Sequence, residues 1–244
     1  MSSDCCKSGF KWEGIPTGTE ATFAGTRTYI TGQSKSAAIL YIHDIFGWKF
    51  PNARVLADYY AEKANATVYV PDFFDGEIVS PEMLEDPVKR ASFSIPDFAA
   101  RHSKDLRWPT ILNFATELRK QYDKVGTIGF CYGGWAVFRL GARDLGLVDC
   151  ISAAHPSMLE DSEIGSLAVP TQILSPEHDF AFTEELKDKC NIVIPRNNIP
   201  YEYVYFPGLA HGFATRGDRN DDVQKKGLER AARSAVGWFG EWLH

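Results

Sequence analysis

Three residues with side chains suited to nucleophilic catalysis are widely separated in this chain: Cys131, Asp179 and His211. A free thiol is mostly protonated at neutral pH, because its ordinary pKa is near 8.5. A neighbouring imidazole can take the thiol proton, and a carboxylate on the far side of the imidazole can fix its tautomer. These residue types, in this order, would support acyl transfer through a thioester on Cys131.

The local sequence around Cys131 strengthens this interpretation. Cys131 is the central residue of Gly129-Phe130-Cys131-Tyr132-Gly133. This G-x-nucleophile-x-G spacing falls between a predicted strand (124–130) and a predicted helix (134–145), the setting of a nucleophile elbow. Such a sharp turn needs almost no side chain two residues before and two residues after the nucleophile. A buried cysteine in a glycine-rich turn is the structural alternative.

Asp179 and His211 also follow predicted strands. The strand at 169–174 precedes the loop that carries Asp179, and the strand at 201–206 precedes the loop that carries His211. Taken singly, each residue is more often structural. Three such residues after three strands, in the chain order nucleophile, acid, histidine, match the order of the α/β-hydrolase fold.

The remaining pattern predicts the same fold class. Short apolar runs alternate with segments of helical period, which favours a mainly parallel sheet with helices on both faces and an active site at the carboxyl ends of the strands. We expect a leader at 1–20, a single domain at 21–244, and an irregular cap or loop at 73–105 that lines a pocket. The other predicted strands are 37–42, 67–70 and 148–154, and the other predicted helices are 55–64, 103–122, 184–190 and 221–243.

A tetrahedral oxyanion needs at least two N–H donors. The backbone of Tyr132, directly after the nucleophile, should supply one donor. The loop after strand 37–42, which reads His43-Asp44-Ile45-Phe46-Gly47, should supply the other, and Ile45 is the residue we expect.

The cysteine elbow, the His43–Gly47 loop, His178-Asp179 and Ala210-His211-Gly212-Phe213 together resemble the dienelactone hydrolase family of α/β-hydrolases. The resemblance spans roughly residues 37–218 and implies Cys131 as nucleophile, His211 as base and Asp179 as its orienting acid. Bacterial members of the family place a glutamate in the loop after the first hydrolase strand, where it contacts the thiol. This chain has Asp44 there, one methylene shorter.

The family's substrates are lactones that carry a carboxylate, so the resemblance also implies an arginine that binds an anion. Arg216, after the His211 loop, is the better candidate, and Arg101, in the irregular segment, is the weaker one. Each arginine could instead form a surface salt bridge. His155 follows another strand, where it could line the pocket, compete for the role of base, or be a hydrogen-bonded loop histidine.

Composition and charge exclude several other functions. The formal net charge is −6 with 26 Lys and Arg against 32 Asp and Glu, so binding to nucleic acid or to an anionic membrane face has no electrostatic support. No apolar stretch approaches the roughly 18 residues of a membrane helix. The N-terminus lacks the pattern of a secretory signal, and the five cysteines lack the spacing of a disulfide framework, so we expect a cytoplasmic protein.

No cofactor or metal is indicated, because the chain has no G-x-G-x-x-G after a first strand, no C-x-x-C and no H-E-x-x-H. The sequence therefore predicts a cysteine-dependent hydrolase of a small ester or lactone, with a carboxylate on the substrate as a further expectation. The same residues would serve a thioesterase or acyl transferase. A non-catalytic binding protein, or a redox-responsive protein with Cys131 as an oxidisable thiol, is the third hypothesis.

Overall fold

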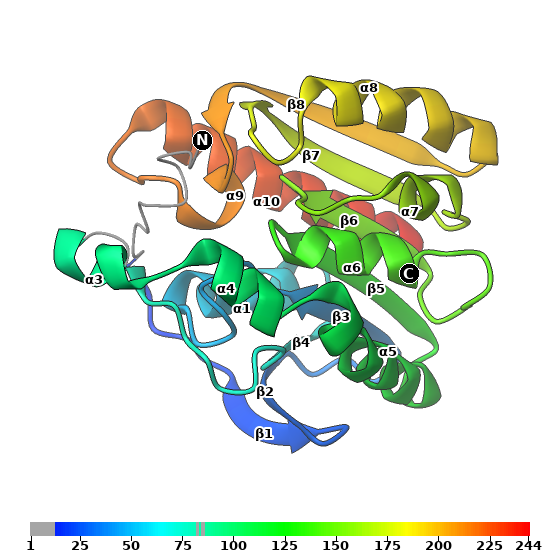
Figure 1. Cartoon of the computed structure of the whole chain (residues 1–244). Coiled ribbons are helices and arrows are strands. Elements are labelled where there is room, and N and C mark those ends of the chain that lie inside the picture. The colour runs from blue at the N-terminus through cyan, green and yellow to red at the C-terminus, as the bar shows by residue number, and fades with distance from the viewer. Residues whose placement is uncertain (1–12, 82, 84–85) are drawn as a thin grey trace.

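The computed structural model describes residues 13–81, 83 and 86–244. Within them, one eight-stranded sheet forms the centre of the molecule (Figure 1). The strands are β1 (Thr19–Phe23), β2 (Thr26–Thr31), β3 (Ala37–Ile42), β4 (Thr67–Pro71), β5 (Lys124–Phe130), β6 (Cys150–Ala154), β7 (Thr171–His178) and β8 (Tyr201–Ala210).

The strand order across the sheet is β1-β2-β4-β3-β5-β6-β7-β8. Only the pairs β1–β2 and β2–β4 of this sheet are antiparallel, and all pairs from β4 to β8 are parallel. The carboxyl ends of β3, β5, β6, β7 and β8 therefore meet at one edge. The expected α/β-hydrolase architecture is confirmed, and this edge is where its reactive residues belong.

Helices cover both faces of the sheet (Figure 1). Helix α1 packs on β4 and against α10, while α5 and α6 pack together on β5. The helices are α1 (Pro51–Lys63), α3 (Pro87–Ser92), α4 (Ile95–Arg101), α5 (Lys104–Gln121), α6 (Gly133–Leu140), α7 (Asp161–Gly165), α8 (Glu184–Val193), the 3-10 helix η2 (Ile194–Asn197), α9 (Phe213–Arg216) and α10 (Asp222–Trp242).

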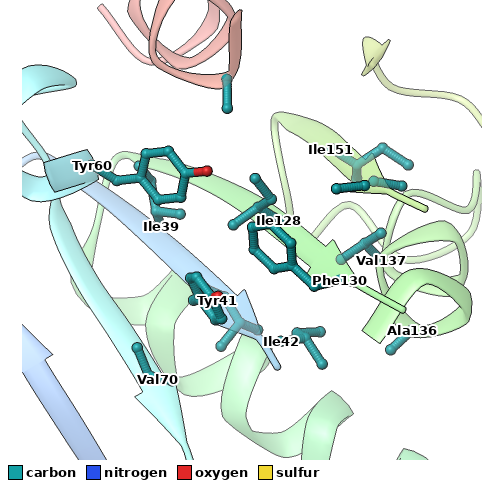
Figure 2. Packing of buried hydrophobic residues seen from close by; sticks show 14 of the residues in the cluster. Ile39, Tyr41, Ile42, Tyr60, Val70, Ile128, Phe130, Ala136, Val137 and Ile151 are labelled. Carbon is teal, nitrogen blue, oxygen red and sulfur yellow. The ribbon is translucent and has the colours of Figure 1, made fainter. Parts of the chain in front are cut away.

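The core is continuous around the central strands. All six residues of β3 are fully buried, as a strand covered on both faces requires. Tyr41 of β3 stacks on Phe130 of β5 with ring centroids 4.7 Å apart (Figure 2). This packing fixes the end of β5, and therefore the turn that follows it.

The sequence-based elements differ from the structure at several places. Strands β1 and β2 and the short helices α7, η2 and α9 were not expected, and the helix expected at 134–145 ends at Leu140. The segment 73–105, expected to be irregular, contains α3 and α4. Strands β7 and β8 run on to His178 and Ala210, which brings the strand ends directly to Asp179 and His211. Cys5 and Cys6 lie outside the described residues.

Among residues 13–81, 83 and 86–244, no helix combines the length and the apolar character that a bilayer crossing requires.

Candidate active site

The turn after β5 has the geometry of a nucleophile elbow. Cys131 has φ of +49°, a strained value for a non-glycine residue, and its side chain is 5% exposed. A Cβ on Gly129 would lie 2.3 Å from the carbonyl oxygen of Gly133, and a Cβ on Gly133 would lie 2.2 Å from that of Ile42. Both positions therefore need glycine, which is the reason for the G-x-C-x-G spacing.

Asp179 and His211 meet because β7 and β8 are neighbours in register. His178 pairs with Ala210 across the two strands, and the backbone N–H of His211 donates to the carbonyl of His178 at 3.0 Å. The next residues then emerge side by side. Nδ1 of His211 lies 2.8 Å and 2.9 Å from the two carboxylate oxygens of Asp179, and both side chains are fully buried.

Cys131 and His211 interact as a charged pair. Burial lowers the pKa of His211, but the negative charge of Cys131 and the hydrogen bond to Asp179 outweigh burial and raise the pKa to about 10. Burial also raises the pKa of Cys131, but the charge and ring N–H of His211, together with the charge of Arg216, hold it below its usual value. Nε2 of His211 is buried and makes no other hydrogen bond within the described part of the chain. Both shifts favour transfer of the thiol proton to the imidazole.

Two other described cysteines show how burial alone changes the pKa of a thiol. Cys150 and Cys190 are buried free thiols. Burial raises the pKa of Cys150 far above its usual value and that of Cys190 to about 12. Of these three cysteines, Cys131 alone has a lowered pKa, the property that favours the thiolate form.

The two expected oxyanion donors lie on the loops that flank the thiol. Tyr132 directly precedes α6, and Ile45 lies in the turn after β3, half-buried. Across the described ranges, neither backbone N–H has a hydrogen-bond acceptor. Both donors therefore remain available to a ligand.

Asp44 joins the β3 loop to α9. Its carboxylate accepts the backbone N–H of Phe46 at 3.0 Å and the hydroxyl of Thr215 at 3.0 Å, and Nε of Arg216 lies 3.6 Å away. The guanidinium of Arg216 also lies over the ring of Phe46. Both charges act on Cys131 in opposite directions, since Arg216 lowers the pKa of its thiol and Asp44 raises it. Asp44 therefore caps its loop and also belongs to the electrostatic surroundings of Cys131.

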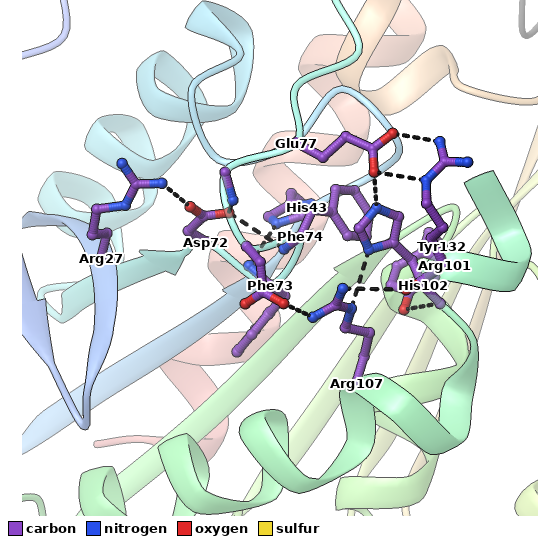
Figure 3. A network of polar contacts seen from close by, with 12 residues as sticks. Arg27, His43, Asp72, Phe73, Phe74, Glu77, Arg101, His102, Arg107 and Tyr132 are labelled. Atoms are coloured by element: carbon purple, nitrogen blue, oxygen red, sulfur yellow. Dashed lines mark hydrogen bonds and ion pairs between the residues drawn. The ribbon is translucent and has the colours of Figure 1, made fainter. Parts of the chain in front are cut away.

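Arg101 has a different setting from Arg216. It ends α4, its side chain is 53% exposed, and it forms two contacts with the carboxylate of Glu77, the closer at 2.7 Å (Figure 3). Its recorded contacts among the described residues do not include Cys131, Asp179 or His211. The surface salt-bridge alternative fits Arg101 better than the role of anion clamp.

Next to Arg101, a polar network connects α4 to the elbow (Figure 3). The hydroxyl of Tyr132 donates to the carbonyl of His102 at 2.7 Å. Nδ1 of His102 accepts from Nε of Arg107, so its Nε2 carries the proton and donates to Glu77 at 2.7 Å. This network holds the segment before α5 against the residue that follows the thiol.

The imidazole of His155 packs against that of His211. His155 is fully buried, its φ is +39°, and its ring centroid lies 4.9 Å from that of His211. Burial and the charges of His211 and Arg216 lower the pKa of His155 well below its usual value. A neutral His155 touches His211 but not Asp179, so it lines the site and does not replace His211 as partner of that carboxylate.

Ser157 is a contact of Cys131 that the sequence did not single out. Its hydroxyl lies 3.4 Å from Sγ of Cys131, and its backbone N–H donates to the carbonyl of Cys131 at 2.9 Å. The sequence feature that could have pointed to Ser157 is its position shortly after β6, the parallel neighbour of β5.

A pocket of about 250 Å³ opens against the end of β8 and α9, and its lining includes His211, Phe213 and Arg216. Cys131, Ile45 and Tyr132 are not among the residues that line this pocket.

Comparisons with known proteins identify the family of this chain. The profile of the Dienelactone hydrolase family matches residues 25–243. Hydrolase pyvD of Aspergillus violaceofuscus is 30% identical over 250 residues, covering 99% of this chain and 97% of that protein. The human carboxymethylenebutenolidase homolog is 29% identical over 262 residues, covering 98% of this chain and 96% of that protein.

Solved structures show the same fold. A dienelactone hydrolase-like promiscuous phosphotriesterase from metagenomic libraries aligns with a TM-score of 0.69 at 14% identity, covering 93% of this chain and 99% of that one. A dienelactone hydrolase from Anabaena variabilis aligns with a TM-score of 0.60 at 14% identity, covering 93% and 98%. With a family match over nearly the whole chain, the expected resemblance is confirmed: this chain belongs to the dienelactone hydrolase family, a family of hydrolases.

Proposed function

We propose that this protein hydrolyses small esters or lactones by nucleophilic catalysis, with Cys131 as nucleophile, His211 as general base and acid, and Asp179 as the group that orients His211. The observation that carries the proposal is the 2.8 Å contact between Nδ1 of His211 and Asp179, together with pKa shifts of Cys131 and His211 that each favour the charged form. A structural cysteine has no need of such an arrangement.

The reaction would proceed in two halves. In acylation, the Cys131 thiolate attacks the carbonyl carbon, a C–S bond forms, and the imidazolium of His211 protonates the departing alkoxide as the C–O bond breaks. In deacylation, neutral His211 takes a proton from water, the hydroxide attacks the thioester, and sulfur leaves as thiolate. The backbone N–H groups of Ile45 and Tyr132 would bind the oxyanion in both halves.

The substrate is a small molecule, and we propose a carboxylate as an accessory group. Arg216 supports this because it is a cationic residue among those that line the pocket, together with His211. Matched p-nitrophenyl esters and small lactones, with and without a carboxylate, test the idea. A preference for the carboxylate that Arg216→Met removes would support it, and equal rates on both series would contradict it.

The nucleophile is tested by Cys131→Ala and Cys131→Ser with an activated aryl ester. We expect Cys131→Ala to lose at least about 10³-fold in kcat/KM, because the remaining groups offer only binding and the oxyanion donors. Cys131→Ser should also be severely impaired, since the site is arranged for a thiolate. Cys190→Ala, which removes a buried thiol of α8, is the matched control and should keep wild-type turnover.

The other hypotheses give different results in the same assay. A thioesterase or acyl transferase would prefer a thioester, or would pass the acyl group to an added alcohol or amine. A binding or redox-responsive protein would be modified once at Cys131 without turnover. If Cys131→Ala kept wild-type rates, Cys131 would not be the nucleophile.

A further inference from the structure

We propose that Ser157 is a further catalytic residue of this site, whose hydroxyl donates a hydrogen bond to the sulfur of Cys131 and stabilises the thiolate when it forms and when it leaves. This inference rests on the proposed function, since it assigns a role within the same two-step reaction. Its geometric basis is the 3.4 Å contact between Oγ of Ser157 and Sγ of Cys131.

The backbone holds Ser157 against the thiol. The N–H of Ser157 donates to the carbonyl of Cys131 at 2.9 Å, and the N–H of Cys131 donates to Ala154 at 3.2 Å. A Cβ on Gly134 would lie 2.4 Å from Cβ of Pro156, so the turn after β6 packs directly on the start of α6. The hydroxyl is therefore positioned by contacts that do not depend on its own hydrogen bond.

The turn that carries Ser157 is also strained. His155 and Met158 have φ values of +39° and +60°, which non-glycine residues seldom adopt. Strain of this kind persists where the surrounding structure imposes it, and it is common at functional sites. Here it places His155 against His211 and Ser157 against Cys131, so one turn contacts both members of the charged pair.

The hydroxyl of Ser157 is not shared between Sγ and a second hydrogen-bond partner among the described residues. Within the described residues, Oγ of Ser157 makes no hydrogen bond other than that to Sγ. Besides this hydroxyl, the groups that act on the thiol are His211 and Arg216, which favour the thiolate, and Asp44, which opposes it. A neutral donor adds stabilisation of the sulfur anion without adding a charge that would disturb the imidazolium.

The contact matters most in deacylation. In the thioester the sulfur is uncharged, and as the C–S bond breaks the electron pair passes to sulfur, while the proton from water stays on His211. A donor already directed at sulfur stabilises this developing charge more than it stabilises the thioester, so it lowers the barrier. In acylation it stabilises the thiolate before attack, so its effect on that step is smaller.

The experiment compares Ser157→Thr with Ser157→Val, which have nearly the same shape and differ in the hydroxyl. Both are made in a Cys5→Ser, Cys6→Ser background, so that iodoacetamide labelling followed by peptide mapping reports Cys131. We expect the pH midpoint of Cys131 alkylation to lie about one unit higher in Ser157→Val than in Ser157→Thr, and deacylation of acetylated enzyme to be about tenfold slower. Ser157→Ala should behave like Ser157→Val, and Ser162→Ala, an exposed serine of α7, should behave like wild type.

The two readouts separate this inference from the proposed function. Alkylation needs no substrate, so its pH midpoint tests the contact even if Cys131→Ala retains turnover. If Cys131→Ala is inactive and Ser157→Val keeps both the wild-type midpoint and the wild-type deacylation rate, the role of Ser157 is overturned while the triad stands. Thermal denaturation of each variant shows whether it is folded, and the Thr variant provides the hydroxyl-bearing reference.

Discussion

At the scale of single residues, the lowered pKa of Cys131 comes from its charged neighbours and not from its burial. Cys150 and Cys190 are buried as deeply, and burial raises the pKa of both thiols. At Cys131 the imidazolium of His211 and the guanidinium of Arg216 reverse that effect. Both neighbours therefore favour the thiolate form of Cys131.

The pH dependence of the reaction follows from these shifts. Because the pKa of Cys131 is lowered and that of His211 is raised to about 10, the thiolate–imidazolium pair exists in the window between them. We expect kcat/KM for an aryl ester to increase with pH, with a midpoint below the ordinary thiol pKa of about 8.5. It should decrease again near pH 10, as His211 loses its proton. His211→Asn should raise the midpoint of Cys131 alkylation above 8.5, since burial then acts unopposed by the imidazolium. An unchanged midpoint would show that His211 does not activate the thiol.

The sequence was sufficient to predict that Cys131, Asp179 and His211 each follow a strand of one parallel sheet, because local patterns mark those strands. It was not sufficient for Ser157. That contact exists because β6 lies beside β5, and strand adjacency is a long-range property that local patterns do not encode. The different settings of Arg216 and Arg101 likewise depend on which carboxylate each arginine meets.

At the scale of elements, the elbow depends on close backbone approach at its glycines. Gly133 has no room for a methyl group, whereas a Cβ on Gly237 of α10 would meet nothing within 4 Å. The identical Gly→Ala change should therefore have opposite effects at these two positions.

We expect Gly133→Ala to destabilise the protein by at least about 2 kcal/mol, through overpacking against Ile42, and to lower activity. Gly237→Ala should stabilise the protein by about 0.5–1 kcal/mol, because alanine favours the helix and restricts the unfolded chain. Urea denaturation and esterase activity of both variants test this pair. Equal stability of the two would mean that the elbow tolerates a side chain there.

Prediction of the strands was most direct where a continuous apolar run marks them, and it missed β1 and β2. The continuous apolar run of β3 indicated its strand directly. β1 is mostly exposed and its apolar content is low, so no periodic signal marked it. Pro176 coincides with a register irregularity in β7, and Pro207 is tolerated because β8 is an edge strand. Because of these two prolines, the last residues of β7 and β8 were predicted as loops.

At the scale of the whole molecule, three buried histidines make the fold sensitive to acid. Burial lowers the pKa values of His43, His102 and His155. Their pKa values in the unfolded chain are near 6.5, so below that pH the unfolded state binds more protons than the folded state, and the free energy of unfolding falls as pH falls.

We therefore expect the melting temperature to drop as the pH is lowered from about 6.5 to 5.5, above the range where most carboxylates titrate. His102→Gln, which can still accept from Arg107 and donate to Glu77, should reduce the drop. Thermal denaturation followed by circular dichroism measures both proteins. A melting temperature that stays constant over this interval would contradict the prediction that these buried histidines are neutral in the folded protein.

The most direct test of the catalytic account is the chemical identity of the reaction intermediate. Acid-quenched enzyme taken during turnover of p-nitrophenyl acetate, digested and analysed by mass spectrometry, should carry one acetyl group on the peptide that contains Cys131. That group should be removed by hydroxylamine and be absent in Cys131→Ala. Acetyl on a different residue, or undiminished turnover in the alanine variant, would contradict Cys131 as the nucleophile.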